Sequence, residues 1–210
     1  MKNKKKFGMK IFIAICIIIV AVCIVIQVIV NNETKQLEKR SEELDTLITQ
    51  TKGGEQIETQ YTHVDDNKFF LKIPTNFYQL DYDTIIQKYS GDIPDIVFSN
   101  DEININIVIS MTENNIKNDE IADFNNQMKD IMKNNTEIIS TNYYTVDGHN
   151  VGQIKLMSNA TDTNIYNNMI CFSYEDKLVI ITFNCTEALR DEWESVGDFI
   201  IDSLFFTDNN

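Results

Sequence analysis

The pattern of apolar and polar positions changes abruptly near the start of the chain. Residues 11–30 are almost continuously apolar, with Gln27 as the one polar side chain and no charged residue. A helix of twenty residues is about 30 Å long, which matches the hydrocarbon core of a bilayer. Because a backbone in lipid must make its hydrogen bonds internally, one lone segment crosses as a helix. The run therefore predicts a transmembrane helix.

A cleaved signal peptide is the competing interpretation, since it also combines a basic start with an apolar stretch. The run is longer than the apolar region of a signal peptide, which has about 7–15 residues. No cleavage site of the small-x-small type follows Val30, and the next residues are polar. We therefore expect residues 11–30 to stay attached and to bind the lipid bilayer.

The lysines at the start of the chain predict its orientation. Residues 1–10 contain five lysines and no acidic residue. Basic residues that flank a membrane helix stay in the cytoplasm. We expect a single-pass protein of the cell membrane with a cytoplasmic tail over residues 1–10 and an extracellular C-terminal domain.

Residues 31–60 are mostly polar and predict a helical stalk followed by a linker. Leu37 and Leu44 lie one heptad apart, but two repeats are few for a coiled coil. We interpret residues 31–52 as a charged helical spacer, and a stalk that joins two chains is the alternative. Gly53 and Gly54 are expected to end the helix.

From residue 61 to residue 210 the pattern is that of one extracytoplasmic α+β domain. Apolar residues alternate with other residues from Phe69 to Ile73 and from Ile103 to Ile109, which is the period of a half-buried strand. An Asp147-Gly148 pair predicts a tight hairpin turn. Further strands are expected near residues 95–99, 137–146, 151–158, 165–174 and 178–185.

Two amphipathic helices are expected to cover the sheet, and a short helix is expected over residues 82–89. Asp119 is placed to cap the first amphipathic helix, and Thr186 is near the start of the second. This order of elements predicts a central antiparallel sheet flanked by helices, an α/β/α sandwich. The two apolar stripes are Ile121, Phe124, Met128, Ile131 and Met132, and Leu189, Trp193, Val196, Ile200 and Leu204.

The order of elements over residues 67–207 resembles the PsbP-like fold family. The resemblance rests on the opening from Phe70 to Pro74 followed by Phe77, on the turn at residues 146–148 that leads into a strand, and on the closing amphipathic helix. It looks especially like small bacterial members of the family that are exported. The resemblance implies a central antiparallel sheet between helical layers and a binding role without chemistry, and it carries no site residue over.

Charge narrows the classes of partner. The formal net charge is −14, and because the first thirty residues contribute five positive charges, residues 31–210 carry −19. A field of this sign repels phosphate backbones, which excludes nucleic acid as a partner. Basic proteins, metal ions and cationic ligands remain compatible with it.

The four cysteines predict no disulfide. Cys16 and Cys23 lie in the apolar run and are interpreted as small apolar residues, with a thiol-linked dimer as the alternative. Cys171 and Cys185 fall on a hairpin that turns near residues 175–177, which places Cys171 opposite residue 180 or 181. Cys185 is then about 13–17 Å away. A disulfide needs Cα atoms within about 7 Å, so these thiols are expected to be free.

Candidate chemistry is sparse, and we assign no catalytic, cofactor-binding or metal-binding residue. The two histidines, His63 and His149, are expected in a linker and a turn as solvated side chains. Asp65 and Asp66 lack the spacing of a metal site. No serine-nucleophile motif and no glycine-rich phosphate loop is present. The acidic clusters at residues 119–123 and 191–194 are explained by their position at helix starts, where a carboxylate interacts favourably with the positive end of the helix dipole.

The polar segment over residues 158–168 is the best candidate for an exposed binding loop, and an ordinary connection is the alternative. Four asparagines precede Thr by two positions, which is the acceptor pattern for N-glycans. Chance is the preferred explanation in such an Asn-rich chain. These asparagines are Asn32, Asn134, Asn159 and Asn184.

The function predicted from these observations is a membrane-anchored binding or accessory module that contacts another envelope protein or complex without catalysis. A cell-envelope hydrolase that uses unrecognised carboxylates is one alternative, and a structural dimer tethered through the stalk is another. A deep pocket with two acids of mutually shifted pKa would favour the hydrolase. The sequence leaves the oligomeric state open.

Overall fold

The computed structural model of this chain describes residues 47–64, 69–89, 91–160 and 162–207. The predicted tail, membrane run and heptad leucines lie outside these residues, as do Asn32, Asp65 and Asp66. Within the described ranges, no helix is both long enough and apolar enough to cross a membrane. The described elements belong to one compact unit that begins at Thr46.

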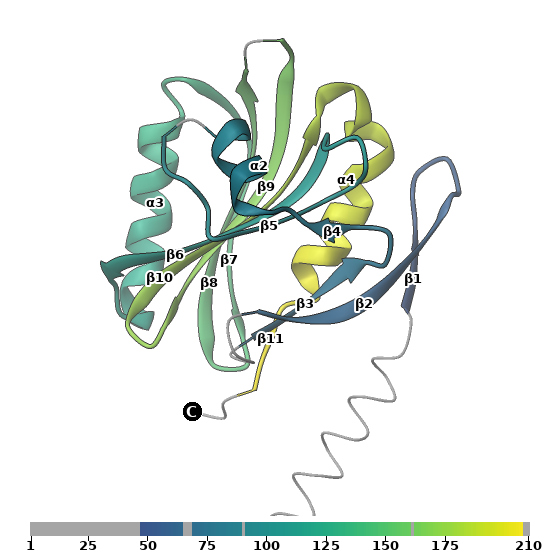
Figure 1. Cartoon of the computed structure of the whole chain (residues 1–210). Helices are drawn as coiled ribbons and strands as arrows, with labels where there is room; N and C mark the ends of the chain where they lie inside the picture. The colour runs from purple at the N-terminus through teal and green to yellow at the C-terminus, as the bar shows by residue number, and fades with distance from the viewer. Residues whose placement is uncertain (1–46, 65–68, 90, 161, 208–210) are drawn as a thin grey trace, which may run out of the picture. The chain divides into compact units, whose positions relative to one another are not determined.

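A seven-stranded antiparallel sheet forms the centre of this unit (Figure 1). Its strand order is β4-β5-β6-β10-β9-β8-β7. The four strands β7, β8, β9 and β10 follow one another along the chain, and each is joined to the next by a hairpin. The strands are β4 (Tyr78–Gln79), β5 (Ile96–Ser99), β6 (Ile105–Asn115), β7 (Thr136–Val146), β8 (His149–Asn159), β9 (Asn164–Tyr174) and β10 (Lys177–Thr186).

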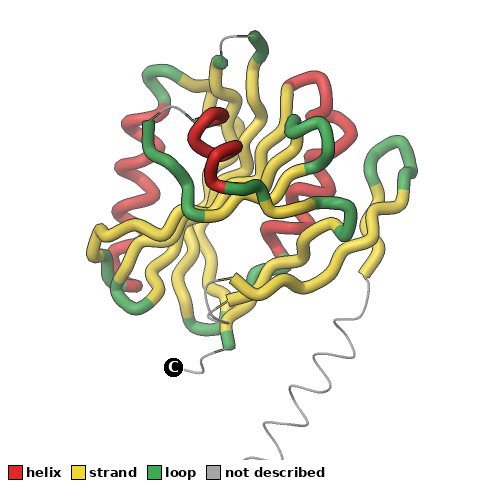
Figure 2. Tube along the Cα trace, viewed as in Figure 1, coloured by secondary structure: helices red, strands yellow, loops and turns green. Residues whose placement is uncertain are grey.

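Helices lie on both faces of this sheet (Figure 2). On one face, α2 (Tyr82–Lys88) packs on Val97 and Val108, and α3 (Ile121–Met132) packs over β7, β8 and β9. A short 3-10 turn, η1 (Asn118–Glu120), precedes α3. On the other face, α4 (Glu187–Asp202) covers β9 and β10. The predicted helices on a central antiparallel sheet are therefore confirmed.

A second antiparallel sheet shares the face that α4 covers, which the sequence did not predict. Its order is β1-β2-β3-β11. Phe69, Leu71 and Ile73 of β3 are buried in the same apolar core as Val196 and Ile200 of α4. The third layer is thus a helix together with a sheet. The strands are β1 (Leu47–Gln50), β2 (Gln56–Val64), β3 (Phe69–Pro74) and β11 (Phe205–Phe206).

The predicted stalk and linker are wrong for residues 47–60. These residues form the β1–β2 hairpin, and Gly53 and Gly54 lie in its turn instead of ending a helix. The turn docks on α4, since the Gly53 N–H donates to Glu192 Oε2 at 2.7 Å. The sequence signal was weak because β2 alternates largely polar residues, although Ile57 and Thr59 are buried. The described domain therefore begins near residue 47, before the predicted start at residue 61.

Two tight turns fix the register of the hairpins, as predicted. Asp147 and Gly148 have φ angles of 47° and 90°, and they join β7 to β8. Glu175 and Asp176 have φ angles of 49° and 59°, and they join β9 to β10. Positive φ at both central residues matches the twist of a two-residue hairpin.

The first amphipathic helix differs from its prediction at two residues. Ile131 is 67% exposed and does not belong to the core, because it lies outside the side of α3 that Met128 and Met132 turn to the sheet. Ile121 is fully buried, and Phe124, Met128 and Met132 pack on the sheet. Glu120 makes the N-terminal contact expected of Asp119, since its Oε2 accepts the Lys117 N–H at 2.8 Å.

Strand β10 presents an apolar row to α4 and a mixed row to the opposite face. The predicted core residues Val179, Ile181, Phe183 and Cys185 are all buried. Gly197 of α4 crosses directly above this row. A Cβ added to Gly197 would lie 2.3 Å from Phe183 Cδ1, which is far inside van der Waals contact. Glycine is therefore required for the close approach of α4 to the sheet.

We predict that Gly197→Ala destabilises the protein although alanine favours helices. The added methyl overpacks the contact with Phe183, and we expect the free energy of unfolding to fall by about 1–3 kcal/mol. Urea unfolding of the full chain in detergent, followed by Trp193 fluorescence, measures this. Ser195→Ala, at an exposed position of the same helix, is expected to change stability by less than about 0.5 kcal/mol. Equal stability of the two variants would contradict the tight contact.

The predicted register of the cysteines is confirmed. Cys171 lies opposite Ile180, whereas Cys185 lies opposite Tyr166. Both thiols are free and buried. Burial raises the pKa of Cys171 to about 11 and that of Cys185 to about 12. These thiols are consequently held in the unreactive protonated form.

We predict that neither thiol reacts with an aromatic disulfide reagent at pH 8 while the protein is folded. The variant should carry Cys16→Ala and Cys23→Ala, so that only Cys171 and Cys185 can respond. We expect labelling to begin only when urea unfolds the domain, as followed by absorbance and mass spectrometry. Labelling within minutes of a folded sample would show that the sulfurs are accessible.

Candidate binding groove

A groove of about 530 Å³ lies between the end of α2 and the loop that joins β8 to β9. Its floor belongs to the face of the seven-stranded sheet on which α2 and α3 pack. Eight of its thirteen lining residues carry an amide or hydroxyl group, and the charged residues in it are Lys88 and Asp162. The amides are Asn104, Asn106, Asn167 and Asn184, and the hydroxyls include Ser158, Thr163 and Thr186.

Three of the amides form a row across adjacent strands. Asn184 of β10 lies opposite Asn106 of β6 on one side and opposite Asn167 of β9 on the other. Asn106 is only 3% exposed, and its Nδ2 donates to Asn184 Oδ1 at 2.8 Å. Its Oδ1 accepts from Lys88 Nζ and from Ser99 Oγ, each at 2.8 Å. Asn106 therefore holds the Asn184 side chain in position. Both polar atoms of its own amide are bonded to side chains of the protein itself.

The other two amides keep unused hydrogen-bonding capacity. Within the described residues, Asn184 Nδ2 and Asn167 Oδ1 make no hydrogen bond of normal geometry. The Tyr89 hydroxyl is buried and makes no hydrogen bond of normal geometry, although a weak hydrogen bond from the Asn184 side chain lowers the pKa of Tyr89. Burial nevertheless raises the pKa of Tyr89 to about 12, so the phenol is neutral. The groove thus presents neutral donors and acceptors that can be offered to a ligand.

Lys88 ties the end of α2 to the start of β6. Its Nζ donates to the carbonyl oxygen of Ile103 and to Asn106 Oδ1. Ile103 was predicted inside the strand, but it has a φ of 54° in the turn that precedes β6, which turns its carbonyl toward Lys88. Desolvation lowers the pKa of Lys88 from an ordinary 10.5 to about 8.

We predict that the Lys88 Cε signal in carbon NMR titrates near pH 8, below the ordinary lysine value of 10.5. The unfolded chain binds a proton that the folded chain lacks between pH 8 and 10.5, so Lys88 makes stability rise with pH in that window. Lys88→Met should remove this rise, whereas Lys129→Met should keep it. A Lys88 midpoint above pH 10 would contradict the desolvated site.

The segment predicted as a binding loop lines this groove. Strand β8 continues to Asn159 and β9 begins at Asn164, so the loop proper is shorter than the predicted segment over residues 158–168. Asp162 and Thr163 form one rim, and Asn167 lies on the floor. The placement agrees with a binding loop, and whether the loop binds a ligand stays a prediction.

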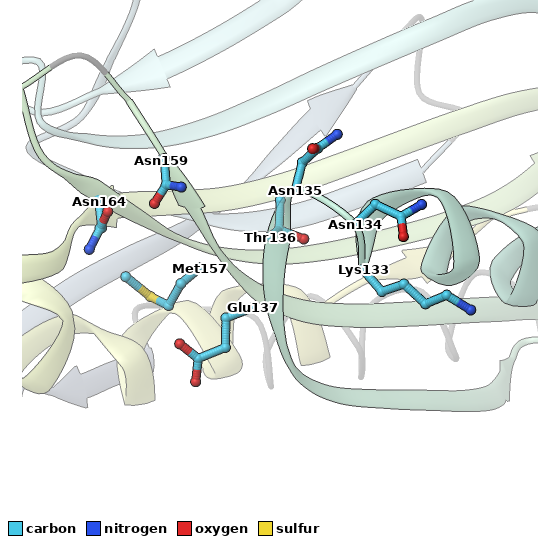
Figure 3. A pocket seen from close by; sticks show the side chains of 8 residues that line it. All are labelled: Lys133, Asn134, Asn135, Thr136, Glu137, Met157, Asn159 and Asn164. Carbon is cyan, nitrogen blue, oxygen red and sulfur yellow. The ribbon is translucent and has the colours of Figure 1, made fainter.

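A second hollow of about 530 Å³ lies at the opposite side of the β8–β9 hairpin, near the end of α3 (Figure 3). It is lined by Lys133, Asn134, Asn135, Thr136, Glu137, Met157, Asn159 and Asn164. The charged side chains of Lys133 and Glu137 extend in different directions and do not converge on one point (Figure 3). This surface is therefore a weaker candidate for a binding site.

The histidines lie apart from the groove, and one differs from its prediction. His149 is 5% exposed, because the turn at Gly148 makes it the first residue of β8 and points it into the core. Its ring stacks on Phe206 with centroids 3.9 Å apart, and Nδ1 lies 3.1 Å from the Ser173 carbonyl oxygen. His63 is exposed as predicted, but it lies in β2 instead of a linker. In the described ranges, no group of three potential ligands could hold a metal ion.

The acidic residues of α4 make tertiary contacts that their helix position did not predict. Asp198 Oδ1 accepts from Lys155 Nζ at 2.6 Å and from Asn168 Nδ2 at 2.9 Å, which ties the helix to β8 and β9. Burial, followed by the charge of Asp198, raises the pKa of nearby Asp202. Glu194 Oε1 accepts from the Tyr166 hydroxyl of β9 at 3.3 Å. Asp198 and Glu194 therefore hold α4 in place, and none of the three carboxylates lines the groove.

No protein-family model and no curated protein sequence matches this chain, but solved structures do. Cyanobacterial PsbP (CyanoP) from Synechocystis sp. PCC 6803 matches with a TM-score of 0.52 and 15% identity. The match covers 70% of this chain and 92% of that one. The chain has the PsbP-like fold. The resemblance noted in the sequence is therefore confirmed at the level of fold.

Two further structures are similar to this PsbP-like domain at lower TM-scores. The Ran-binding protein Mog1p from Saccharomyces cerevisiae has a TM-score of 0.45 and 15% identity, covering 72% of this chain and 97% of that one. LpqN from Mycobacterium tuberculosis, described as involved in cell envelope biogenesis, has a TM-score of 0.47 and 12% identity, covering 72% and 92%. At these identities the likeness concerns the fold alone.

Sequence reasoning missed the floor of the groove in this PsbP-like domain. The signal that could have found it is the presence of Asn106 and Asn184 at strand positions whose sequence neighbours are mostly apolar. Polar residues on the inner strands of a covered sheet need a partner or a solvent-filled space. The sequence does not show that these two amides are neighbours. The strand register shows it, since it sets them opposite each other.

Proposed function

We propose that this chain is a membrane-anchored extracytoplasmic binding module that acts without catalysis and works with another protein or complex of the cell envelope. The observation that carries this proposal is the groove, a recess lined by neutral amides and hydroxyls with unused hydrogen-bonding capacity. Concave sites with a few convergent polar groups are typical of ligand binding. Donors and acceptors of this kind hold a ligand reversibly and need no reaction.

The anchor supports a position next to the membrane. The apolar run over residues 11–30 is followed by a polar segment that leads to β1 at Leu47. The sixteen residues between them extend at most about 55 Å even when fully stretched. The domain, with the −19 charge that residues 31–210 carry, is thereby kept within reach of membrane-associated partners. Its acidic character favours partners that are neutral or basic.

The hydrolase alternative has less support from the geometry. Asp198 and Asp202 lie one turn apart on α4, which is the type of pair that such an enzyme would use. Asp198, however, is occupied by Lys155 and Asn168, and only the pKa of Asp202 is raised. The pair serves the packing of α4, so we place the function in the groove.

We predict that the rim of the groove contacts a partner in living cells. A photoreactive amino acid at Asp162 should give a discrete crosslinked adduct, identified by mass spectrometry. The matched control is Ile131, which is also exposed but lies on α3 away from the groove. Adducts of equal yield at both positions, or none at Asp162, would contradict the proposed site.

We also predict that the two ends of the chain lie on opposite sides of the membrane. A cysteine at Glu175, in the exposed β9–β10 turn, should react with an impermeant maleimide in intact cells. A cysteine at Lys4 should react only after lysis. Both tests use a chain in which Cys16 and Cys23 are alanine. The reverse labelling pattern would overturn the proposed orientation.

A further inference from the structure

The chemistry of the groove narrows the class of ligand, given the proposed function on which this step rests. The groups with unused capacity are neutral: an amide donor at Asn184 and an amide acceptor at Asn167. The Thr186 side chain also lines the groove and makes no capping hydrogen bond to α4, although Thr186 is the N-cap residue. A ligand that satisfies them must itself both donate and accept, as hydroxyl groups do.

The spacing of these groups matches one sugar ring. Adjacent strands lie about 4.8 Å apart, and Asn184 lies directly opposite Asn167, so the free donor and the free acceptor are about 5 Å apart on the floor. A pyranose ring has a similar length, and its hydroxyls project along both edges. One sugar ring laid across β10 and β9 would therefore meet the Asn184 donor and the Asn167 acceptor.

Charge disfavours an anionic ligand. Lys88 is the cation in the lining, and its ammonium already donates to two oxygens of the protein. The surrounding domain is strongly acidic, so a polyanion would be repelled before it reached this one lysine. A neutral ligand needs no free cation in the groove and is not repelled by the acidic domain.

The position of the groove disfavours an extended peptide. Peptides that add to a sheet pair with the backbone of an edge strand. The floor here is made from the inner strands β6, β10 and β9, whose backbone edges are already paired on both sides. Recognition in this groove must therefore use side chains alone, which suits a saccharide.

We propose that the groove binds a neutral saccharide, and that this sugar is the part of the envelope partner that the domain recognises. Asn184 and Asn167 bind the hydroxyls from the floor, Thr186 binds them from the side, and Lys88 holds Asn106 and the β6 turn in place. The ligand is released unchanged.

The test uses the full chain in micelles of a zwitterionic detergent, because sugar-based detergents would occupy the groove. Nitrogen NMR signals of the side-chain amides are followed during titration with cellotetraose, chitotetraose and maltotetraose. We expect at least one sugar to shift the Asn184 and Asn167 signals in a saturable way. Inorganic phosphate and tetraethylene glycol, which probe anion binding and acceptor-only binding, should leave these signals in place.

Two variants keep the fold and remove single contacts. Asn184→Asp preserves the acceptor for Asn106 and removes the amide donor, and we expect it to weaken sugar binding at least fivefold. Its matched control is Asn126→Asp on the exposed side of α3, which makes the same change of charge and should bind as the wild type does. Thr186→Val, which changes no charge, should weaken binding at least twofold.

Each outcome decides the proposal. Absence of a saturable shift with all three sugars, an equal response to phosphate, or unchanged binding by Asn184→Asp would overturn it. If crosslinking at Asp162 still identifies a partner while no sugar binds, the saccharide proposal fails and the binding module stands. If neither crosslinking nor sugar binding is observed, both proposals fail.

Discussion

The register of strand β10 is the constraint on which the rest of this structure depends. β10 lies in the middle of the seven-stranded sheet, and its side chains alternate between two different environments. Phe183 packs under Gly197 of α4, while the next residue, Asn184, faces the groove between two other asparagines. A slip by one residue would place Asn184 in the apolar core and Phe183 in the groove. The same register therefore builds the core and the candidate binding site.

Much of the fold could be predicted from the sequence because its signals are local. The period of two in β6 and β10, the Asp147-Gly148 turn and the apolar stripe of α4 each depend on residues close together in the chain. The β1–β2 hairpin was missed because β2 alternates largely polar residues and because its turn is held by a tertiary contact, the bond from the Gly53 N–H to Glu192. His149 was misplaced for a related reason, since its burial under Phe206 depends on the far end of the chain.

The groove could not be predicted because no short segment contains it. Lys88, Asn106, Asn167 and Asn184 come from one helix end and three strands, and the strand order of the sheet brings them together. The polar segment near residue 160 predicted only one rim. Sequence motifs describe catalytic residues and metal ligands, whereas this site consists mainly of neutral amides. No motif therefore points to it. The proposed binding role therefore becomes specific only through cross-strand geometry.

The pairing of β10 with β6 can be measured directly by disulfide formation. In the full chain with Cys16 and Cys23 replaced by alanine, Asn106→Cys combined with Asn184→Cys places two thiols on directly opposite residues, within bonding reach. The account predicts that mild oxidation links residues 106 and 184, as identified by peptide mass spectrometry, and leaves native Cys185 reduced. A disulfide between residue 106 and Cys185 would place the strand one residue out of register and contradict both the core and the groove described above.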